Sequence, residues 1–172
     1  MTLRTKTSSL IAACLIGSTM LFSVGSAEAG NRFRVEQYGD DNGAASAQYG
    51  DGNRAYQEQR GRAHTIRSQQ DGWRNRASTY QRGRGNEGAT RQRGRRNEVV
   101  LGQDGRYNFG EVIQRGADNI AGIAQFGDNN GATIRQRGRG NAAGVIQYGS
   151  GHDTRIIQRG RGNIVLNIQG QW

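Results

Sequence analysis

The sequence has one cysteine and no proline among 172 residues. Cys14 lies within an apolar run near the N-terminus, so a chain cleaved behind that run has no thiol for a disulfide or a thiolate metal site. Large apolar residues are also scarce. Leu, Ile, Val and Phe number 21 in residues 30–172, a proportion at which disorder is the default expectation. Disordered chains are typically rich in proline, however, and its absence leaves nearly every backbone N–H free to join a β ladder.

Residues 1–29 have the features of a Sec-type signal peptide. A basic start precedes an apolar run over residues 10–24, and the small-residue site Ala27-Glu28-Ala29 follows. Gly and Ser interrupt the run, which makes a transmembrane helix the weaker interpretation. We expect cleavage after Ala29 and a secreted mature chain, residues 30–172, without a membrane span. Without Arg4, Lys6 and Glu28, the totals of 24 basic and 14 acidic residues become 22 and 13, a charge of +9.

An eleven-residue repeat occupies almost all of the mature chain. Twelve units of the form Q-x-G-x-x-N-x-x-x-x-x run without insertion over residues 37–168. Residues 30–36 form a short N-terminal segment in the same phase, and residues 169–172 are the remnant of a further unit. Counting Gln as position 1, the Gln residues are Gln37, Gln48, Gln59, Gln70, Gln81, Gln92, Gln103, Gln114, Gln125, Gln136, Gln147, Gln158 and Gln169. Position 3 holds Gly39, Gly50, Gly61, Gly72, Gly83, Gly94, Gly105, Gly116, Gly127, Gly138, Gly149 and Gly160. Position 6 holds Asn42, Asn53, Asn75, Asn86, Asn97, Asn108, Asn119, Asn130, Asn141 and Asn163, with His64 and His152 in the other two units.

The repeat predicts strands rather than helices. An eleven-residue period also suits a right-handed coiled coil, but a glycine in every unit would cost about 1 kcal/mol each inside a helix. Positions 6, 8, 10 and the next 1 hold no charged residue in any unit, and all Arg, Asp and Glu fall between them or in the turn. Such alternation is typical of a strand with one buried face. We therefore predict strands from position 6 to the next position 2, turns at positions 3 to 5, and an all-β solenoid of stacked strand-turn-strand rungs.

The recurring stretch QRGRGN, at 81–86, 136–141 and 158–163, fits this scheme. Its Gln and Asn point inward, its glycines belong to the turn and its arginines face water. Stacked units place amide over amide about 4.8 Å apart, and side-chain amides carry both donors and acceptors, so a column of them can satisfy itself. His64 and His152 replace Asn in such columns and are too far apart for a metal site. We predict no enzyme activity, no metal and no cofactor.

The paired half-repeats, such as Gln136-Arg-Gly-Arg-Gly-Asn141-Ala-Ala143-Gly-Val-Ile-Gln147, resemble those of curlins, the subunits of bacterial curli amyloid fibres. The resemblance covers the whole repeat region. It implies passage through the periplasm and a curli-type outer-membrane secretion channel, then self-assembly on the cell surface into biofilm-matrix fibres, with another curlin as partner. It also implies that the Gln and Asn columns stabilise the amyloid. Only residues 30–36 stand where the family usually carries a longer targeting segment, and the Arg content leaves major and nucleating minor subunit both open.

Several points remain open from the sequence. Two units per rung follow the family, whereas three would also divide twelve. A soluble, secreted β-solenoid that binds nucleic acid or acidic polysaccharide through its Arg-rich face is the alternative function, although such proteins need terminal caps and both ends here stay in phase. An RNA-binding Arg-Gly segment is disfavoured by the strict register. Position 10 turns from polar to aliphatic after the fifth unit, so we expect the C-terminal half to order first.

Overall fold

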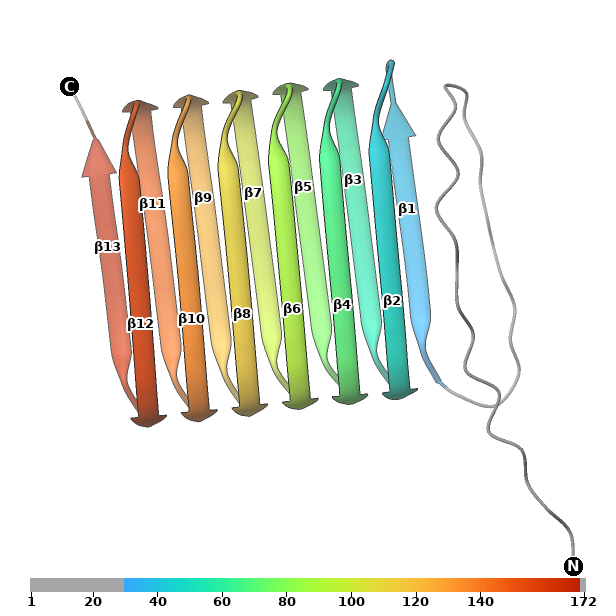
Figure 1. The fold of residues 1–172 in the computed structure, drawn as a ribbon, viewed down its shortest axis with the longest axis vertical. Coiled ribbons are helices and arrows are strands. Elements are labelled where there is room, and N and C mark those ends of the chain that lie inside the picture. The colour runs from blue at the N-terminus through green and yellow to red at the C-terminus, as the bar shows by residue number, and fades with distance from the viewer. Residues whose placement is uncertain (1–29, 171–172) are drawn as a thin grey trace, which may run out of the picture.

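A computed structural model describes residues 30–170, and every regular element in that range is a β-strand (Figure 1). The predicted signal peptide, residues 1–29, lies outside the described residues. The described part of the chain has no helix long and apolar enough to cross a membrane. The strands are β1 (Arg32–Tyr38), β2 (Gly43–Asp51), β3 (Arg54–Arg62), β4 (Thr65–Trp73), β5 (Arg76–Arg84), β6 (Glu87–Arg95), β7 (Glu98–Arg106), β8 (Phe109–Ala117), β9 (Ile120–Asp128), β10 (Gly131–Arg139), β11 (Ala142–Ser150), β12 (Asp153–Arg161) and β13 (Ile164–Gly170).

The strands form two parallel sheets that face each other (Figure 1). Odd-numbered strands make a seven-stranded sheet and even-numbered strands a six-stranded one. Each strand pairs with the strand two further along the chain. Gln114 therefore lies beside Gln136, and each repeat position pairs with the same position in the next rung. The predicted β-solenoid is confirmed, and the rung consists of two units, not three.

The corner between strands differs from the prediction. The nine-residue strands β2 to β12 run from position 7 of one unit to position 4 of the next, whereas the predicted strands run from position 6 to position 2. The position-3 glycines of these strands therefore lie inside the strands and not in a turn. These glycines have φ between 92° and 130°, yet pairing continues through them. The corner itself lies at positions 5 and 6, and all twelve residues at position 5 have positive φ, including Arg96 and Tyr107. The ladder continues even here, because Arg74 N–H donates to Asp51 O across 2.9 Å.

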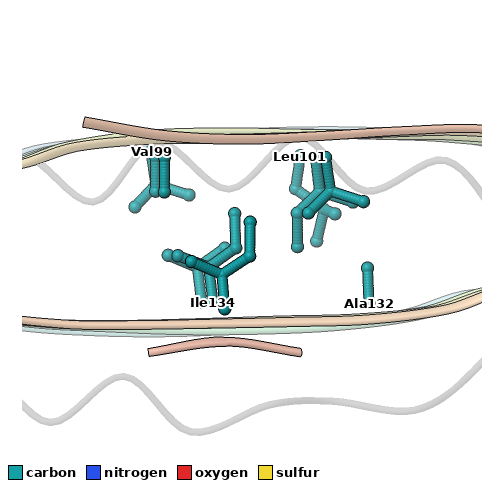
Figure 2. Close-up of a cluster of buried hydrophobic side chains, with 10 residues drawn as sticks. Val99, Leu101, Ala132 and Ile134 are labelled. Carbon is teal, nitrogen blue, oxygen red and sulfur yellow. The ribbon is translucent and has the colours of Figure 1, made fainter. Parts of the chain in front are cut away.

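The interior between the sheets is thin and packs large side chains against small ones. Leu101, at position 10 of β7, packs against position 8 of the facing strands β6 and β8, where Gly88 and Gly110 stand. Seen along the stack, position 10 of each sheet lies across from position 8 of the other, as the labels of Leu101 and Ala132 show (Figure 2). The fit is close, since a Cβ added to Gly110 would lie 2.5 Å from Leu101 Cδ1. The bulk of Leu101 therefore requires small residues at position 8 of the facing strands.

Apolar packing is concentrated toward the C-terminal end of the stack. The N-terminal rungs instead bury Ser46, Gln57, Ser68, Thr79 and Thr90 at position 10. The main cluster consists of Val99, Leu101, Val112, Ala121, Ile123, Ala132, Ile134, Ala143, Val145 and Ile156. The two ends of the stack thus differ in how much apolar surface stabilises them.

Candidate functional site

The Gln side chains form two continuous columns, one inside each sheet. Gln114 is typical, because its Nε2 donates to Gln136 Oε1 in the next rung at 2.9 Å and to Glu98 O in the opposite sheet at 3.0 Å. The side chain is fully buried. Each Gln therefore joins successive rungs and also ties the two sheets together. All Gln-to-Gln bonds run from N-terminal donor to C-terminal acceptor, with lengths between 2.7 and 3.0 Å.

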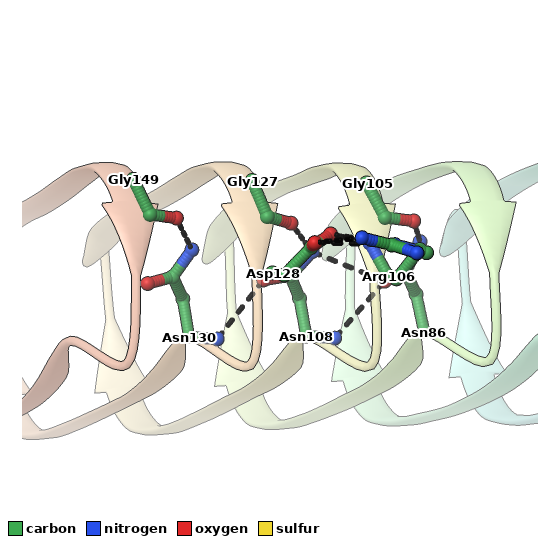
Figure 3. A network of polar contacts seen from close by, with 8 residues as sticks. All are labelled: Asn86, Gly105, Arg106, Asn108, Gly127, Asp128, Asn130 and Gly149. Atoms are coloured by element: carbon green, nitrogen blue, oxygen red, sulfur yellow. Dashed lines mark hydrogen bonds and ion pairs between the residues drawn. The ribbon is translucent and has the colours of Figure 1, made fainter.

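The Asn side chains form a second set of columns at the corners (Figure 3). Asn108 donates from its backbone N–H and from Nδ2 to Asn86 Oδ1, at 3.0 and 3.1 Å. Its Nδ2 also reaches Gly127 O at 2.7 Å, in the rung above. A single amide thereby fixes its own corner to both neighbouring rungs. The Asn-to-Asn donors point toward the N-terminal end, opposite in direction to the Gln columns.

The position-3 glycines allow the rungs to approach each other closely. Gly127 has φ of 115°, and a Cβ added there would lie 2.9 Å from the carbonyl carbon of Gly149 and closer still to its oxygen. L-residues rarely adopt this φ, and the overlap involves backbone that cannot move aside. Glycine is therefore required at position 3 for two independent reasons.

His64 takes the place of Asn in its column without breaking the column. It is fully buried, Asn86 N–H donates to its Nδ1 at 3.2 Å, and its Nε2 lies 3.2 Å from Arg60 O. These contacts require a neutral ring with the proton on Nε2. Burial lowers the pKa of the imidazole, and the backbone contacts oppose this shift only partly. His152 makes the same kind of backbone contact at a more exposed site, with Nε2 2.9 Å from Tyr148 O.

The outer faces carry the charges, as the alternation predicts. Some Arg side chains lie over acids in the next rung, such as Arg106 beside Asp128, with Nη2 2.6 Å from Oδ2 (Figure 3). Hydrogen bonding to that guanidinium lowers the pKa of the Asp128 carboxyl. Two of the three QRGRGN copies are one rung apart, so Arg137 stacks on Arg159 and Arg139 on Arg161. Predicting these stacked arginines from the sequence required knowing that a rung contains two units.

No group of three His, Cys, Asp or Glu residues within residues 30–170 could hold a metal ion. What the described residues offer throughout is a repeated set of hydrogen-bonding groups along the axis of the stack.

Comparison with known families agrees with this architecture. A family model described as the curlin-associated repeat matches residues 94–127, 108–138 and 127–160. Residues 94–160 of this chain therefore consist of curlin-associated repeats. The matched residues extend from β6 to β12, and the same register of Gln, Gly and Asn continues through the repeats N-terminal to them. No curated protein matches the chain.

Proposed function

We propose that this curlin-repeat protein is a structural subunit of an extracellular amyloid-like fibre and that it polymerises head to tail. The observation that carries the proposal is that the backbone pairing and the Gln-to-Gln bonds between rungs recur every 22 residues, so a second copy can supply the same contacts at either end. The edge strands are β1 and β2 at one end and β12 and β13 at the other. Open edges of parallel sheets are templates for further strands.

The C-terminal edge has the surface of an interior rung rather than that of a cap. Val165, at the inward position 8 of β13, is 40% exposed, and its outward neighbour Leu166 is 64% exposed. In the rungs below, Ala121 and Ala143 occupy position 8 and are buried. A further rung would bury Val165 and leave Leu166 on the outside.

This difference provides a matched pair of variants, Val165→Lys and Leu166→Lys, in the chain that begins at Gly30. Both add one charge to an already exposed side chain, but only lysine at 165 would be enclosed by the next subunit. Inward-pointing charges at sheet edges block edge pairing. Assembly is followed by sedimentation and thioflavin T fluorescence after dilution from denaturant.

We expect Leu166→Lys to assemble like the parent and Val165→Lys to remain soluble with a circular dichroism spectrum of β-structure. Equal assembly by both variants, or a parent that stays monomeric, would refute head-to-tail stacking.

Export and cell-surface attachment are part of the same proposal. Residues 1–29 direct the chain to the periplasm, and a curli-type channel and a second curlin subunit complete the pathway. The role is structural and requires no catalysis. N-terminal sequencing of the secreted protein should begin at Gly30, whereas a chain that retains residue 1 would contradict processing.

A second candidate function, binding of anionic matrix polymers, is favoured by one feature of the six-stranded sheet. Positions 2 and 4 at its C-terminal end stack Arg115, Arg137 and Arg159, and beside them Arg139 and Arg161. Among the described residues none of these five forms an ion pair with an acid. Aligned cations without counter-charges attract polyanions, and this attraction weakens with salt.

The matching control lies at position 2 of the other sheet, where Arg60 and Arg82 face Glu58 and Asp104. Replacing Arg137 and Arg159 by Gln should weaken binding of a fluorescent DNA oligonucleotide more than the same change at Arg60 and Arg82. Equal effects, or binding insensitive to salt, would refute the site.

A further inference from the structure

The two sheets contain different numbers of strands, seven and six. At the C-terminal end β13 therefore projects half a rung beyond β12, and at the N-terminal end β1 precedes β2 by half a rung (Figure 1). Stacking a second copy in the same orientation would place its β1 on β13. That arrangement would leave one strand missing from the six-stranded sheet at every junction, between β12 and β2 of the next copy.

We propose that each subunit is instead rotated by about 180° around the fibre axis relative to the one before it. In this arrangement β1 of the next copy pairs with β12, and β2 of that copy pairs with β13. The inference rests on the proposed head-to-tail assembly. The rotation keeps all strands parallel within each sheet, because the arrows of the two sheets point in opposite directions (Figure 1).

Charge complementarity at the edges favours the rotated arrangement. With Gln37 placed on Gln158, in the register that every observed pair keeps, Arg32 of the next copy lies over Asp153. In the same alignment Asp40 lies over Arg161. Both are opposite-charge pairs one rung apart, like Arg106 with Asp128 inside the protein.

The same register brings Tyr38 over Arg159, which repeats the observed contact of Arg60 with the Tyr38 ring at 5.2 Å. One pair is unfavourable, Arg34 over Arg155. In the unrotated arrangement β1 would face Ile164, Leu166 and Ile168, and no opposite-charge pair would form.

A buried hydroxyl supplies an independent argument. Ser46 Oγ, in the edge strand β2, is buried and has no hydrogen-bond partner among residues 30–170. In the rotated stack the residue beneath it is Asn167 of β13, whose Oδ1 already accepts from Thr154 Oγ1 at 3.1 Å. The Asn167 Nδ2 is then directed to a hydroxyl that needs a donor. In the unrotated stack Ser46 would face the missing strand.

The last Gln of the six-stranded sheet likewise lacks the amide-to-amide bond that a further subunit would supply. Interior residues such as Gln136 donate to the next Gln at 2.8 Å, whereas Gln158 Nε2 donates to Asn163 O at 3.1 Å. Placing Gln37 of the next copy on Gln158 restores the bond between amides. Thirteen strands at two per rung then give six and a half rungs, or about 31 Å of fibre per subunit.

Disulfide cross-linking distinguishes the two arrangements. The chain from Gly30 contains no cysteine, so two double variants can be compared, Arg34→Cys with Arg155→Cys and Arg34→Cys with Leu166→Cys. All three sites are at the outward position 9. In the rotated stack residues 34 and 155 lie about 4.8 Å apart, within disulfide range, while 34 and 166 lie on opposite outer faces more than about 7 Å apart. Residues 34 and 155 belong to opposite ends of one molecule, so any disulfide joins two copies.

Fibres of both variants are oxidised and separated on a non-reducing denaturing gel. The 34/155 variant should give a ladder of covalent multimers, and the 34/166 variant should remain monomeric. The opposite result, or monomers from both variants in fibres visible by electron microscopy, would overturn the rotation and leave the fibre function intact. Failure of both variants and of the parent to form fibres would overturn the proposed function itself.

Charge reversal gives a second readout. Arg32→Asp should slow elongation of parent seeds, and adding Asp153→Arg to the same chain should restore elongation between copies of the double variant. Equal slowing by the single and the double variant would contradict the pairing of these two residues.

Discussion

The position-3 glycines offer the strictest test of how the rungs stack. We consider Gly127→Ala in β9, with Gly122→Ala in the same strand as its control. An added Cβ at Gly127 meets the Gly149 carbonyl group, whereas one at Gly122 has no atom within 4 Å. Gly127 has φ of 115°, while Gly122 does not have positive φ. The two substitutions add the same methyl group to one strand in opposite environments.

The expected magnitudes follow from these environments. A non-glycine residue held in a sparsely populated backbone region costs about 1–3 kcal/mol, and overpacking against fixed atoms adds about 1–3 kcal/mol. Gly127→Ala should therefore lower the free energy of unfolding by about 2–6 kcal/mol. Replacing a strand glycine by alanine in open space is favourable by about 0.5–1 kcal/mol, which is the expectation for Gly122→Ala.

The assay is urea unfolding followed by far-ultraviolet circular dichroism, at a protein concentration where sedimentation shows monomers. Gly127→Ala should shift the midpoint strongly to lower urea, and Gly122→Ala should shift it slightly upward. Equal shifts for the two variants would mean that the glycine carbonyl column does not set the spacing of the rungs.

Three further predictions concern the columns and the core. Below about pH 6.5 the imidazole of His64 takes up a proton in the unfolded chain, whereas burial opposes its protonation in the folded protein, so the free energy of unfolding should fall on acidification. His64→Asn should remove this pH dependence in urea titrations. The same dependence of the free energy of unfolding on pH in the parent and the variant would contradict this prediction. Gln114→Leu leaves a buried donor and acceptor unpaired and should cost about 1–3 kcal/mol in the same assay, against little change for the neighbouring Arg115→Gln, and equal losses would contradict the amide column. The peptide 98–172 should fibrillise faster than 30–97 at equal concentration and salt, because the apolar cluster lies in it, and equal or reversed lag times would refute this.

The architecture could be predicted because the repeat combines two signals that agree. The invariant spacing of Gln determines the length of the unit, and the confinement of charge to alternate positions determines which face is buried. His64 was also predictable as a substitute for Asn, since it occupies the same position in an otherwise uniform pattern. These features depend on local alternation, which a single sequence displays directly.

The remaining features depend on contacts between units. The number of units per rung decides which residues stack, and the period alone does not specify it. The strands extend past the position-3 glycines because those residues keep their ladder hydrogen bonds at positive φ. Whether these bonds form depends on the backbone of the neighbouring rung. The match of Leu101 with Gly88 and Gly110 across the interior likewise requires knowing which strands face each other.

The most direct test of the central claim is X-ray fibre diffraction from the chain that begins at Gly30, diluted from denaturant and aligned. Stacked rungs predict a meridional reflection near 4.8 Å and an equatorial reflection near about 10 Å from the facing sheets. A soluble species that gives neither reflection, at concentrations where preformed curli seeds also fail to recruit it, would contradict assembly by rung stacking.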